Sequence, residues 1–284
     1  MFILGTANFG NSYVGSKTII DISKASELLY NFKKSDGILI DSALNYGQSL
    51  NLIKQMNLEG LNITTKIPTS ILHDYDLLDH HLNWLDTNYK NKIRYLLLHD
   101  TNNLDLLPKK SIYRLMRFLE QNNSIKFGAS IYFYDELIKV LDVFPIIRHV
   151  QAPLNYFDRR FIDKNFIKFC DEKKLSLHYR SIFLQGKLLQ NSAQLNKYFK
   201  QFEQFSYYYQ EVEKKKYKNL LEFNLRFIRT CVTYEKIILG VENIIQMQEI
   251  VNTINYIMAS DEHYDFKDII FNEELSIPMN WKLI

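Results

Sequence analysis

Residues 38–49 read ILIDSALNYGQS, a short apolar run that ends in Asp41 and is followed five residues later by Tyr46. Two further apolar runs, ITTKI at 63–67 and YLLLH at 95–99, lie downstream, and each also contains or ends in a polar residue. Short apolar runs between longer amphipathic stretches are typical of buried parallel strands. The pattern therefore predicts a sheet whose strand ends carry functional side chains.

Apolar runs of the same kind recur along the whole chain and predict eight strands, at 2–6, 38–42, 63–67, 95–99, 125–130, 149–153, 175–181 and 236–241. Apolar residues at three- and four-residue spacing predict helices between them, at 21–33, 74–89, 111–121, 133–141, 161–173 and 243–258. Eight strands alternating with helices over about 250 residues fit a closed (β/α)8 TIM barrel better than an open doubly wound sheet. Because no linker composition marks a boundary, we expect one domain over 1–284.

Residues 187–235 form an unusually long connection between the seventh and eighth predicted strands. Its 191–235 portion contains neither Pro nor Gly, which predicts an extended helical segment. It carries an aromatic cluster followed by a lysine run, at Phe202, Phe205, Tyr207, Tyr208, Tyr209 and Lys214, Lys215, Lys216. One interpretation is a partner-binding surface; the favoured one is an apolar helix face packed on the barrel.

The composition is that of an ordinary globular protein, with 284 residues of which 46% are hydrophobic and 24% charged. This excludes disordered and disulfide-scaffold classes. The two cysteines, Cys170 and Cys231, have no zinc-ligand spacing and favour a reducing cytoplasm. A net charge of +3 is too small to predict a nucleic-acid partner, and no apolar stretch predicts a membrane span or leader. The sequence makes no prediction of oligomeric state.

Four polar side chains are expected at one rim of the barrel, since Asp41, Lys66 and His99 end strands two, three and four and Tyr46 lies in the loop after strand two. An ammonium group beside a phenol lowers the phenol's pKa from its usual value near 10. A carboxylate would hold the lysine, and an imidazole would hydrogen bond an oxygen that is being protonated. The set suits proton delivery to a carbonyl oxygen, with a cofactor supplying hydride.

The chain resembles the aldo-keto reductase superfamily along nearly its full length. The similar segments are LGTANFG, DSALNYGQS, TTKI, LLLHD, KFGAS, HVQAPLNYFDRR and LGVENIIQMQE, in the family's order. The resemblance implies a TIM barrel without a Rossmann motif that reduces an aldehyde or ketone with NADP(H), the family's usual cofactor, and it implies no metal. The expected partner is then a small-molecule carbonyl substrate.

Carried over position by position, the resemblance implies that Tyr46 is the general acid, Lys66 its pKa partner, Asp41 the counter-ion of the lysine and His99 the group that orients the carbonyl. Ser130 and Gln151 fall where family members bind the nicotinamide carboxamide. The complete set of cofactor-binding positions that the resemblance implies is Ser130, Gln151, Arg180, Gly240, Glu242, Asn243, Gln246 and Glu249.

Several of these positions depart from the family pattern, all of them on the cofactor side. Ile131 replaces a common asparagine, Arg180 stands near a tyrosine that often stacks on nicotinamide, and Gln246 replaces a common arginine. Glu242 places a carboxylate close to the expected 2′-phosphate, where it would repel phosphate and accept a bond from a ribose hydroxyl. NAD(H) use is therefore possible beside the NADP(H) default.

Two other functions remain open at this point. A metal-assisted barrel hydrolase would use Asp41, His99, Asp100 and His178 as ligands, although it leaves Tyr46 and Lys66 without roles. A regulatory or binding protein would keep the rim residues but bind cofactor weakly.

The loops and the tail permit two finer expectations. Polar loop residues would suit a hydroxylated, sugar-like carbonyl compound, namely Asn11, Tyr13, Asn45, Asn102, Asn103, Tyr132 and Arg180. The tail SIPMNWKLI resembles the Pro-x-x-Trp ending of some bacterial members of the superfamily, with Trp281 as a packing anchor.

Overall fold

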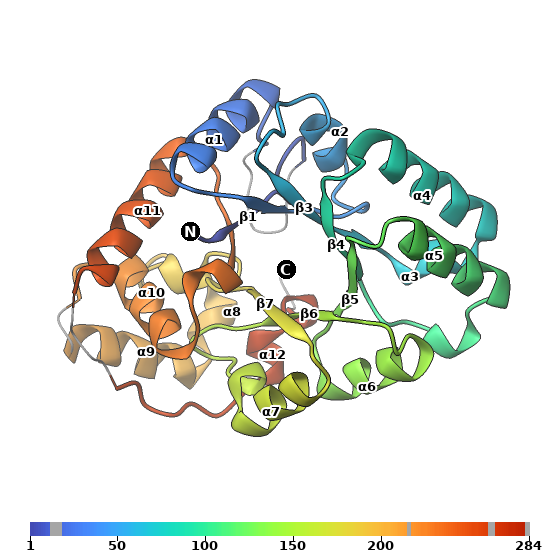
Figure 1. The fold of residues 1–284 in the computed structure, drawn as a ribbon. Coiled ribbons are helices and arrows are strands. Elements are labelled where there is room, and N and C mark those ends of the chain that lie inside the picture. Colours follow the sequence, from blue (N-terminus) through green and yellow to red (C-terminus); the bar gives the residue numbers. More distant parts are fainter. Residues whose placement is uncertain (12–18, 215–216, 261–264, 282–284) are drawn as a thin grey trace.

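The computed structural model describes residues 1–11, 19–214, 217–260 and 265–281 and contains all eight predicted strands in a central ring (Figure 1). They are β1 (Ile3–Gly5), β2 (Leu39–Asp41), β3 (Asn62–Ile67), β4 (Ile93–Leu98), β5 (Lys126–Ser130), β6 (His149–Pro153), β7 (Ser176–Arg180) and β8 (Ile238–Gly240). The bounds of each strand lie within one or two residues of those of its apolar run. This agreement is expected because a strand that is buried on both faces needs apolar residues along its length.

The strands pair in parallel in the order β7-β6-β5-β4-β3-β2-β1-β8. In this sheet β1 lies between β2 and β8, with Leu4 opposite Ile40 and Leu239. A parallel bridge between Tyr179 of β7 and Ile237, which precedes β8, joins the two edges. The prediction of a (β/α)8 barrel is confirmed, and the carboxyl ends of the strands meet at one rim.

Helices surround the strands, and all six helices predicted between them are present (Figure 1). Asp or Asn side chains accept backbone N–H bonds at the start of most long helices, such as Asp21 before α1 and Asn243 before α11, which explains where these begin. The helices are α1 (Ile22–Lys34), α2 (Ser49–Ile53), α3 (Thr69–His73), α4 (Tyr75–Tyr89), α5 (Lys109–Gln121), α6 (Tyr134–Val143), α7 (Lys164–Glu172), α8 (Lys197–Lys200), α9 (Glu203–Lys214), α10 (Leu220–Cys231), α11 (Ile244–Met258) and α12 (Glu273–Ser276). Short 3-10 turns lie at Leu104–Leu106, Arg160–Ile162, Lys187–Leu189, Tyr234–Lys236 and Pro278–Asn280.

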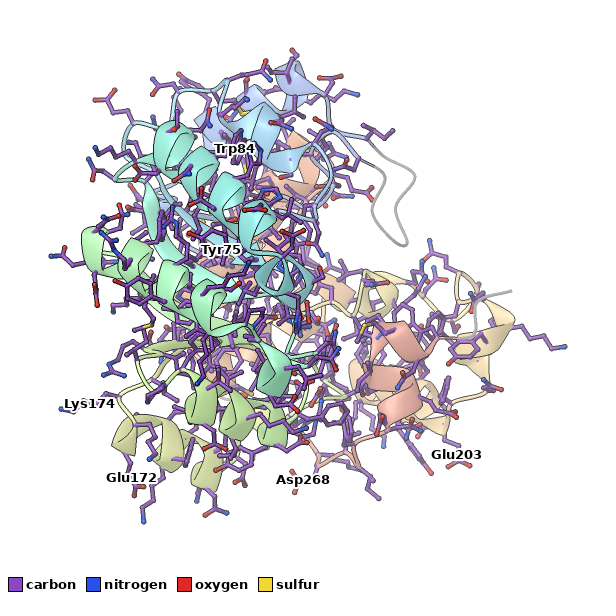
Figure 2. The ribbon with its side chains drawn as sticks, turned by 90° about the vertical axis from the view of Figure 1, so that its right-hand side faces the viewer. Tyr75, Trp84, Glu172, Lys174, Glu203 and Asp268 are labelled. Carbon is purple, nitrogen blue, oxygen red and sulfur yellow. The ribbon has the colours of Figure 1, made fainter. Side chains whose placement is uncertain are left out.

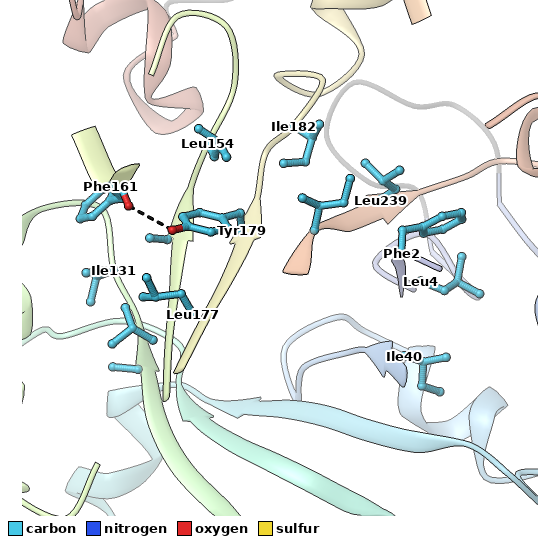
Figure 3. Packing of buried hydrophobic residues seen from close by; sticks show 14 of the residues in the cluster. Phe2, Leu4, Ile40, Ile131, Leu154, Phe161, Leu177, Tyr179, Ile182 and Leu239 are labelled. Carbon is cyan, nitrogen blue, oxygen red and sulfur yellow. Dashed lines mark hydrogen bonds between the residues drawn. The ribbon is translucent and has the colours of Figure 1, made fainter. Parts of the chain in front are cut away.

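The hydrophobic core lies between the strands and the surrounding helices (Figure 3). Leu4, Ile40, Leu177 and Leu239 alternate with inward-facing residues along their strands and are buried in this layer. Tyr179 belongs to the same layer and donates its hydroxyl hydrogen to the Phe161 carbonyl oxygen over 3.1 Å. The apolar side of each strand is thus fixed, which directs the alternate side chains into the barrel.

The barrel interior is polar in the half that lies away from the rim. His149 begins β6 and packs on His178 of β7, with ring centroids 4.3 Å apart, and Tyr95 of β4 contacts both rings. The Nδ1 atom of His149 lies 2.8 Å from the Ser176 hydroxyl. His178 therefore packs against aromatic side chains inside the barrel.

The extended helical segment between β7 and β8 is confirmed by α8, α9 and α10, which lie together on one flank of the barrel (Figure 1). Glu203 of this flank lies far from Tyr75 and Trp84 of α4 in the side view (Figure 2). Phe205 and Tyr208 are buried, so most of the aromatic cluster is core, as the favoured interpretation has it.

The other residues of the aromatic cluster and lysine run do not all belong to the core. Tyr207 is exposed and lines a hollow of about 460 Å³ between α9 and residues 267–270. Lys215 and Lys216 lie outside the described residues. Trp281 is buried against Phe199 of α8, with ring centroids 4.8 Å apart, and it donates its indole hydrogen to the Leu275 carbonyl. The tail therefore packs on the inserted helices.

Both cysteines are free thiols, Cys170 buried and Cys231 half-buried. Among the helices that the structure describes, none combines the length and apolar character needed to cross a bilayer.

Candidate active site

The structure brings together the four rim residues that the sequence singled out. Lys66 of β3 donates from Nζ to Asp41 Oδ1 over 2.5 Å, to the Ser42 carbonyl oxygen over 3.1 Å and to Tyr46 Oη over 3.4 Å. The His99 ring lies edge-on to the Tyr46 ring at 5.6 Å between centroids. Asp41 and Lys66 are almost fully buried, so this is an ion pair held out of water below a half-buried phenol.

The loop that carries Tyr46 is held by Asn11. The Asn11 side chain donates to the Tyr46 carbonyl oxygen over 2.5 Å and accepts from the Gln48 backbone N–H over 2.9 Å. Gly47, between these two residues, has φ +49°, and a Cβ atom there would lie 2.0 Å from Asn11 Oδ1. The sequence led us to expect the Asn11 amide to contact a substrate. In the structure this amide instead supports the loop.

A hydroxyl network fixes the backbone at the start of the same loop. The Thr6 hydroxyl donates to the Asp41 carbonyl oxygen over 2.9 Å, and the Ser49 hydroxyl donates to the Thr6 carbonyl over 2.9 Å. Ser42 Oγ lies 3.0 Å from Ser49 Oγ. Sequence reasoning missed the two bonds of Thr6 and that of Asn11 to the Tyr46 carbonyl because they join residues 35 to 43 positions apart, a separation that has no local signal.

The pKa of the Tyr46 phenol is raised above its usual value, which is opposite to the net lowering that the sequence predicted. Burial disfavours the phenolate most strongly, and the Asp41 carboxylate and Tyr132 also raise the pKa. The Arg180 guanidinium acts in the opposite direction but does not outweigh them. In the free protein Tyr46 is therefore a protonated phenol at neutral pH.

His99 is neutral at physiological pH. Burial, followed by the positive charges of Lys66 and Arg180, lowers its pKa to about 3, against a smaller opposite effect of Asp100. Its Nδ1 atom is buried without a hydrogen-bond partner among the described residues. A neutral imidazole carries one N–H donor, which suits it to hydrogen bond an uncharged carbonyl oxygen.

Gln151 of β6 lies at the same rim but points its amide toward Asp41. Its Nε2 donates to Asp41 Oδ2 over 2.8 Å, so Lys66 and Gln151 together hold both carboxylate oxygens. Within the described part of the chain, the buried Oε1 of Gln151 has no hydrogen-bond partner. An unsatisfied buried acceptor of this kind fits the N–H donor of a carboxamide.

Ser130 and Arg180, at the ends of β5 and β7, contact each other. Arg180 Nε donates to Ser130 Oγ over 3.2 Å, and the Arg180 guanidinium lies 4.0 Å from the centroid of the Tyr132 ring. Ser130 can still donate its own hydroxyl hydrogen to a ligand oxygen. The Ile131 side chain is fully buried in the apolar layer (Figure 3). It therefore does not make the contact that the asparagine makes in the family pattern.

The expected adenosine end of the site lies at β8 and α11. Gly240 is exposed, with open space where a Cβ atom would lie. The Asn243 side chain accepts from the Gln246 backbone N–H and the Gln246 side chain accepts from the Glu242 backbone N–H, each over 2.9 Å. Glu249 is exposed on α11. Two of the amides that would bind a phosphate are thus already bonded within the protein, and the first turn of α11 has no basic residue.

The contacts at the rim suit a nicotinamide head, whereas those at β8 and α11 do not favour a 2′-phosphate. Gln151 and Ser130 offer an acceptor and a donor for a carboxamide at the rim. Glu242 adds negative charge at the other end, where a carboxylate can accept from a ribose hydroxyl.

The ligands of the alternative metal site are not assembled. Asp100 accepts from the backbone N–H of Thr69 over 3.2 Å and from that of Asn102 over 3.1 Å, and His178 packs on His149. Of the residues with described positions, no three His, Cys, Asp or Glu side chains group to hold a metal ion.

The remaining polar loop residues differ in where they lie. Asn45, Asn102 and Asn103 are exposed, Tyr132 packs on Arg180, and Tyr13 lies outside the described residues.

Comparison with known proteins gives a structural likeness without a sequence relative. Neither a family model nor a curated protein matches the chain. A glycerol dehydrogenase from Gluconobacter oxydans matches with 16% identity, 95% of each chain covered and a TM-score of 0.64. An aldo-keto reductase from Klebsiella pneumoniae in complex with NADPH matches with 14% identity, covering 96% of this chain and 88% of its own, at a TM-score of 0.63.

A Pseudomonas aeruginosa protein described as an aldo-keto reductase matches with 16% identity over 90% of each chain, at a TM-score of 0.62. Aldo-keto reductases recur among the similar structures, with nearly complete coverage of both chains. The chain therefore has the fold of the aldo-keto reductases.

Proposed function

We propose that the protein reduces an aldehyde or ketone to an alcohol with NADH or NADPH. The observation that carries the proposal is the buried Lys66–Asp41 pair directly below the Tyr46 hydroxyl, beside a neutral imidazole at His99. The shared fold and the NADPH complex of the Klebsiella pneumoniae protein support the choice of cofactor class.

Tyr46 is the proton donor in this proposal. Its raised pKa keeps the phenol protonated until negative charge develops on a nearby carbonyl oxygen, which then takes the proton from Tyr46 Oη. The phenolate that remains is stabilised by the Lys66 ammonium at 3.4 Å and by the charge of Arg180. A bound reduced nicotinamide supplies the hydride that the carbonyl carbon receives.

His99 orients the carbonyl group. A neutral ring donates one hydrogen bond to the carbonyl oxygen without competing as a proton donor, because its pKa of about 3 makes the imidazolium rare at neutral pH. Asp41 positions Lys66 and is itself positioned by Gln151, whose free Oε1 would bind the carboxamide of the cofactor together with Ser130.

At the adenosine end we propose that Gly240, Glu242, Asn243, Gln246 and Glu249 line the cofactor path and that NADH is accepted as well as NADPH. The absence of a cation in the first turn of α11 and the charge of Glu242 support this choice. With two free thiols, the protein is proposed to work in the reducing cytoplasm.

A barrel that binds a ligand without turnover is the alternative. It is favoured by the bonds that Asn243 and Gln246 already make at the start of α11 and by the contact of Arg180 with Ser130, which both occupy expected cofactor-binding groups.

Tyr46→Phe tests the proposal. We expect kcat for reduction of an aldehyde to fall by about 10²- to 10⁴-fold, the range for loss of a general acid, with the Kd of the nicotinamide nearly unchanged. Tyr113→Phe, on an exposed tyrosine of α5, is the matched control and should keep full activity. Full activity in Tyr46→Phe would refute the mechanism, and failure of both nicotinamides to quench protein fluorescence at millimolar concentration would favour the binding protein.

A further inference from the structure

In the part of the chain that the structure describes, the groups that bond Arg180 at the rim are neutral. Its Nε donates to Ser130 Oγ, its Nη1 to Ser181 Oγ over 3.3 Å and its Nη2 to the Ile131 carbonyl oxygen over 3.0 Å. The guanidinium also stacks on Tyr132. These contacts fix its direction, and none of them supplies a negative charge.

Other partly or fully buried arginines of the chain are paired with carboxylates. Arg226 lies 2.7 Å from Glu222 and Arg160 lies 2.8 Å from Asp158. Over residues 1–11, 19–214, 217–260 and 265–281, no carboxylate oxygen lies within 4.0 Å of Arg180. Since a half-buried guanidinium gains most from a charged acceptor, the Arg180 site can take an anion that the described residues do not supply.

The Arg180 charge lies at the rim, at the end of β7, where its guanidinium contacts Ser130 and Tyr132. Arg180 acts electrostatically on both Tyr46 and His99, the two groups proposed to face the carbonyl oxygen. A guanidinium has five N–H donors, and three of them make the bonds described, so two remain for a ligand. Carboxylates match two adjacent guanidinium donors in geometry and charge.

We propose that Arg180 binds the carboxylate of the substrate, so that the site prefers oxo acids to neutral aldehydes and ketones. The inference rests on the proposed carbonyl reduction and adds to it the substrate class. It also gives Arg180 a role that differs from the cofactor contact expected from the sequence.

Matched pairs of substrates test the preference in the wild-type protein. Glyoxylate, 4-oxobutanoate and 6-oxohexanoate are each compared with their methyl esters, which keep the carbonyl and lose the charge. We expect kcat/KM of at least one acid to exceed that of its ester by about tenfold or more, and Arg180→Met to reduce this ratio to about one. Arg180→Lys should retain part of the ratio, and Arg94→Met, at an exposed arginine of β4, should retain all of it.

Calorimetry separates this inference from the proposed reaction, because it needs no turnover. Succinamate, an unreactive amide with a carboxylate, should bind the wild-type protein at least about tenfold more tightly than neutral butanamide, and this difference should vanish in Arg180→Met. Reduction of esters and acids at equal rates, with equal binding of the two amides, would overturn the role of Arg180 while leaving carbonyl reduction in place.

Two further outcomes can be told apart by the same measurements. If none of the carbonyl compounds is reduced, the proposed function fails, and the calorimetric pair alone decides whether Arg180 binds carboxylates. If Arg180→Met instead weakens NADH binding about tenfold and leaves the acid-to-ester ratio unchanged, the charge serves the cofactor and the inference is overturned.

Discussion

The Lys66 ammonium nitrogen lies 3.4 Å from the Tyr46 hydroxyl oxygen and 2.5 Å from an Asp41 carboxylate oxygen. The lysine is thus much closer to its counter-ion than to the phenol. A positive charge and a raised tyrosine pKa coexist here because burial of the phenol raises the pKa most strongly and the Asp41 carboxylate raises it as well. The Lys66 ammonium group stabilises Tyr46 most after the phenol has lost its proton and become a phenolate.

Lys66→Met should therefore affect the reaction in both directions. Without the ammonium group the phenolate is less stable, so aldehyde reduction should slow by about 10²-fold. Alcohol oxidation requires the phenolate as base, so the pH at which it reaches half its maximum should move upward by about one unit or more. Steady-state rates between pH 6 and 11 measure both effects.

Two controls keep this result interpretable. Lys92→Met removes a lysine that donates to the Leu58 carbonyl oxygen, outside the rim cluster, and should leave the pH profile unchanged. Lys66→Met leaves Asp41 without its buried cation, so Lys66→Met combined with Asp41→Asn removes the whole pair and restores stability lost to an unpaired charge. An unshifted profile in both rim variants would mean that Lys66 does not act on Tyr46.

The placement of the catalytic candidates could be predicted because it depends on strand ends. Asp41, Lys66 and His99 lie in or just after three neighbouring strands, and parallel strands in a barrel place such residues at one rim. The eight strands could be predicted for the related reason that each is a short apolar run buried on its outer face. Both the burial of a strand and its place in the strand order can be inferred from the linear sequence.

Interactions that depend on side-chain direction could not be predicted in this way. Asn11 was assigned to a substrate but bonds the Tyr46 loop, and the stacking of Arg180 on Tyr132 had no signal in the sequence. The direction of the Tyr46 pKa was also wrong, because desolvation depends on how much of the molecule surrounds the phenol. Short helices such as α2 and α3 lack enough turns for a periodic pattern.

The contact between Asn11 and Gly47 predicts coupled effects. Asn11→Ala removes two bonds that hold the loop, so kcat should fall by about tenfold with little change in nicotinamide Kd. Gly47→Ala should do at least as much harm, since the new Cβ meets Asn11 Oδ1 and the positive φ is strained. The double variant should be less impaired than the product of the single effects, because the clash disappears with the Asn11 side chain.

Asn31→Ala is the matched control for this pair. It removes an asparagine amide bond to the Glu27 carbonyl oxygen on exposed α1, where no effect on kcat is expected. Strictly multiplicative effects of Asn11→Ala and Gly47→Ala would show that the two positions act independently.

Glu242 should set the preference between the two nicotinamides. Glu242→Gln removes the charge that would repel a 2′-phosphate while keeping a similar shape, so the Kd of NADPH should fall about three- to tenfold and that of NADH should change little. Fluorescence titration at low salt measures both constants, and Glu27→Gln on exposed α1 is the control for a lost surface charge. An equal change for NADH and NADPH would place Glu242 away from the 2′-position.

The buried His178 ring should make the fold sensitive to acid. Burial, with the charges of Lys236 and Lys126, lowers its pKa to about 4, whereas the unfolded chain protonates near the ordinary value of 6.5. Between these values the unfolded state binds more protons, so the free energy of unfolding falls as pH falls, by up to about 1.4 kcal/mol per pH unit for this group. His178→Phe keeps an aromatic ring against His149 and Tyr95 but does not titrate.

Urea denaturation of His178→Phe at pH 7, 6 and 5 should therefore show a shallower loss of stability on acidification, by about 1 kcal/mol per pH unit, than in the wild-type protein. The remaining slope has other sources, since the lowered pKa values of His149 and His99 act in the same direction. His80→Gln, at an exposed histidine of α4, should reproduce the wild-type slope. If His178→Phe also reproduces it, the ring accepts a proton as readily in the folded protein as in the unfolded one, and the polar interior of the barrel is accessible to water.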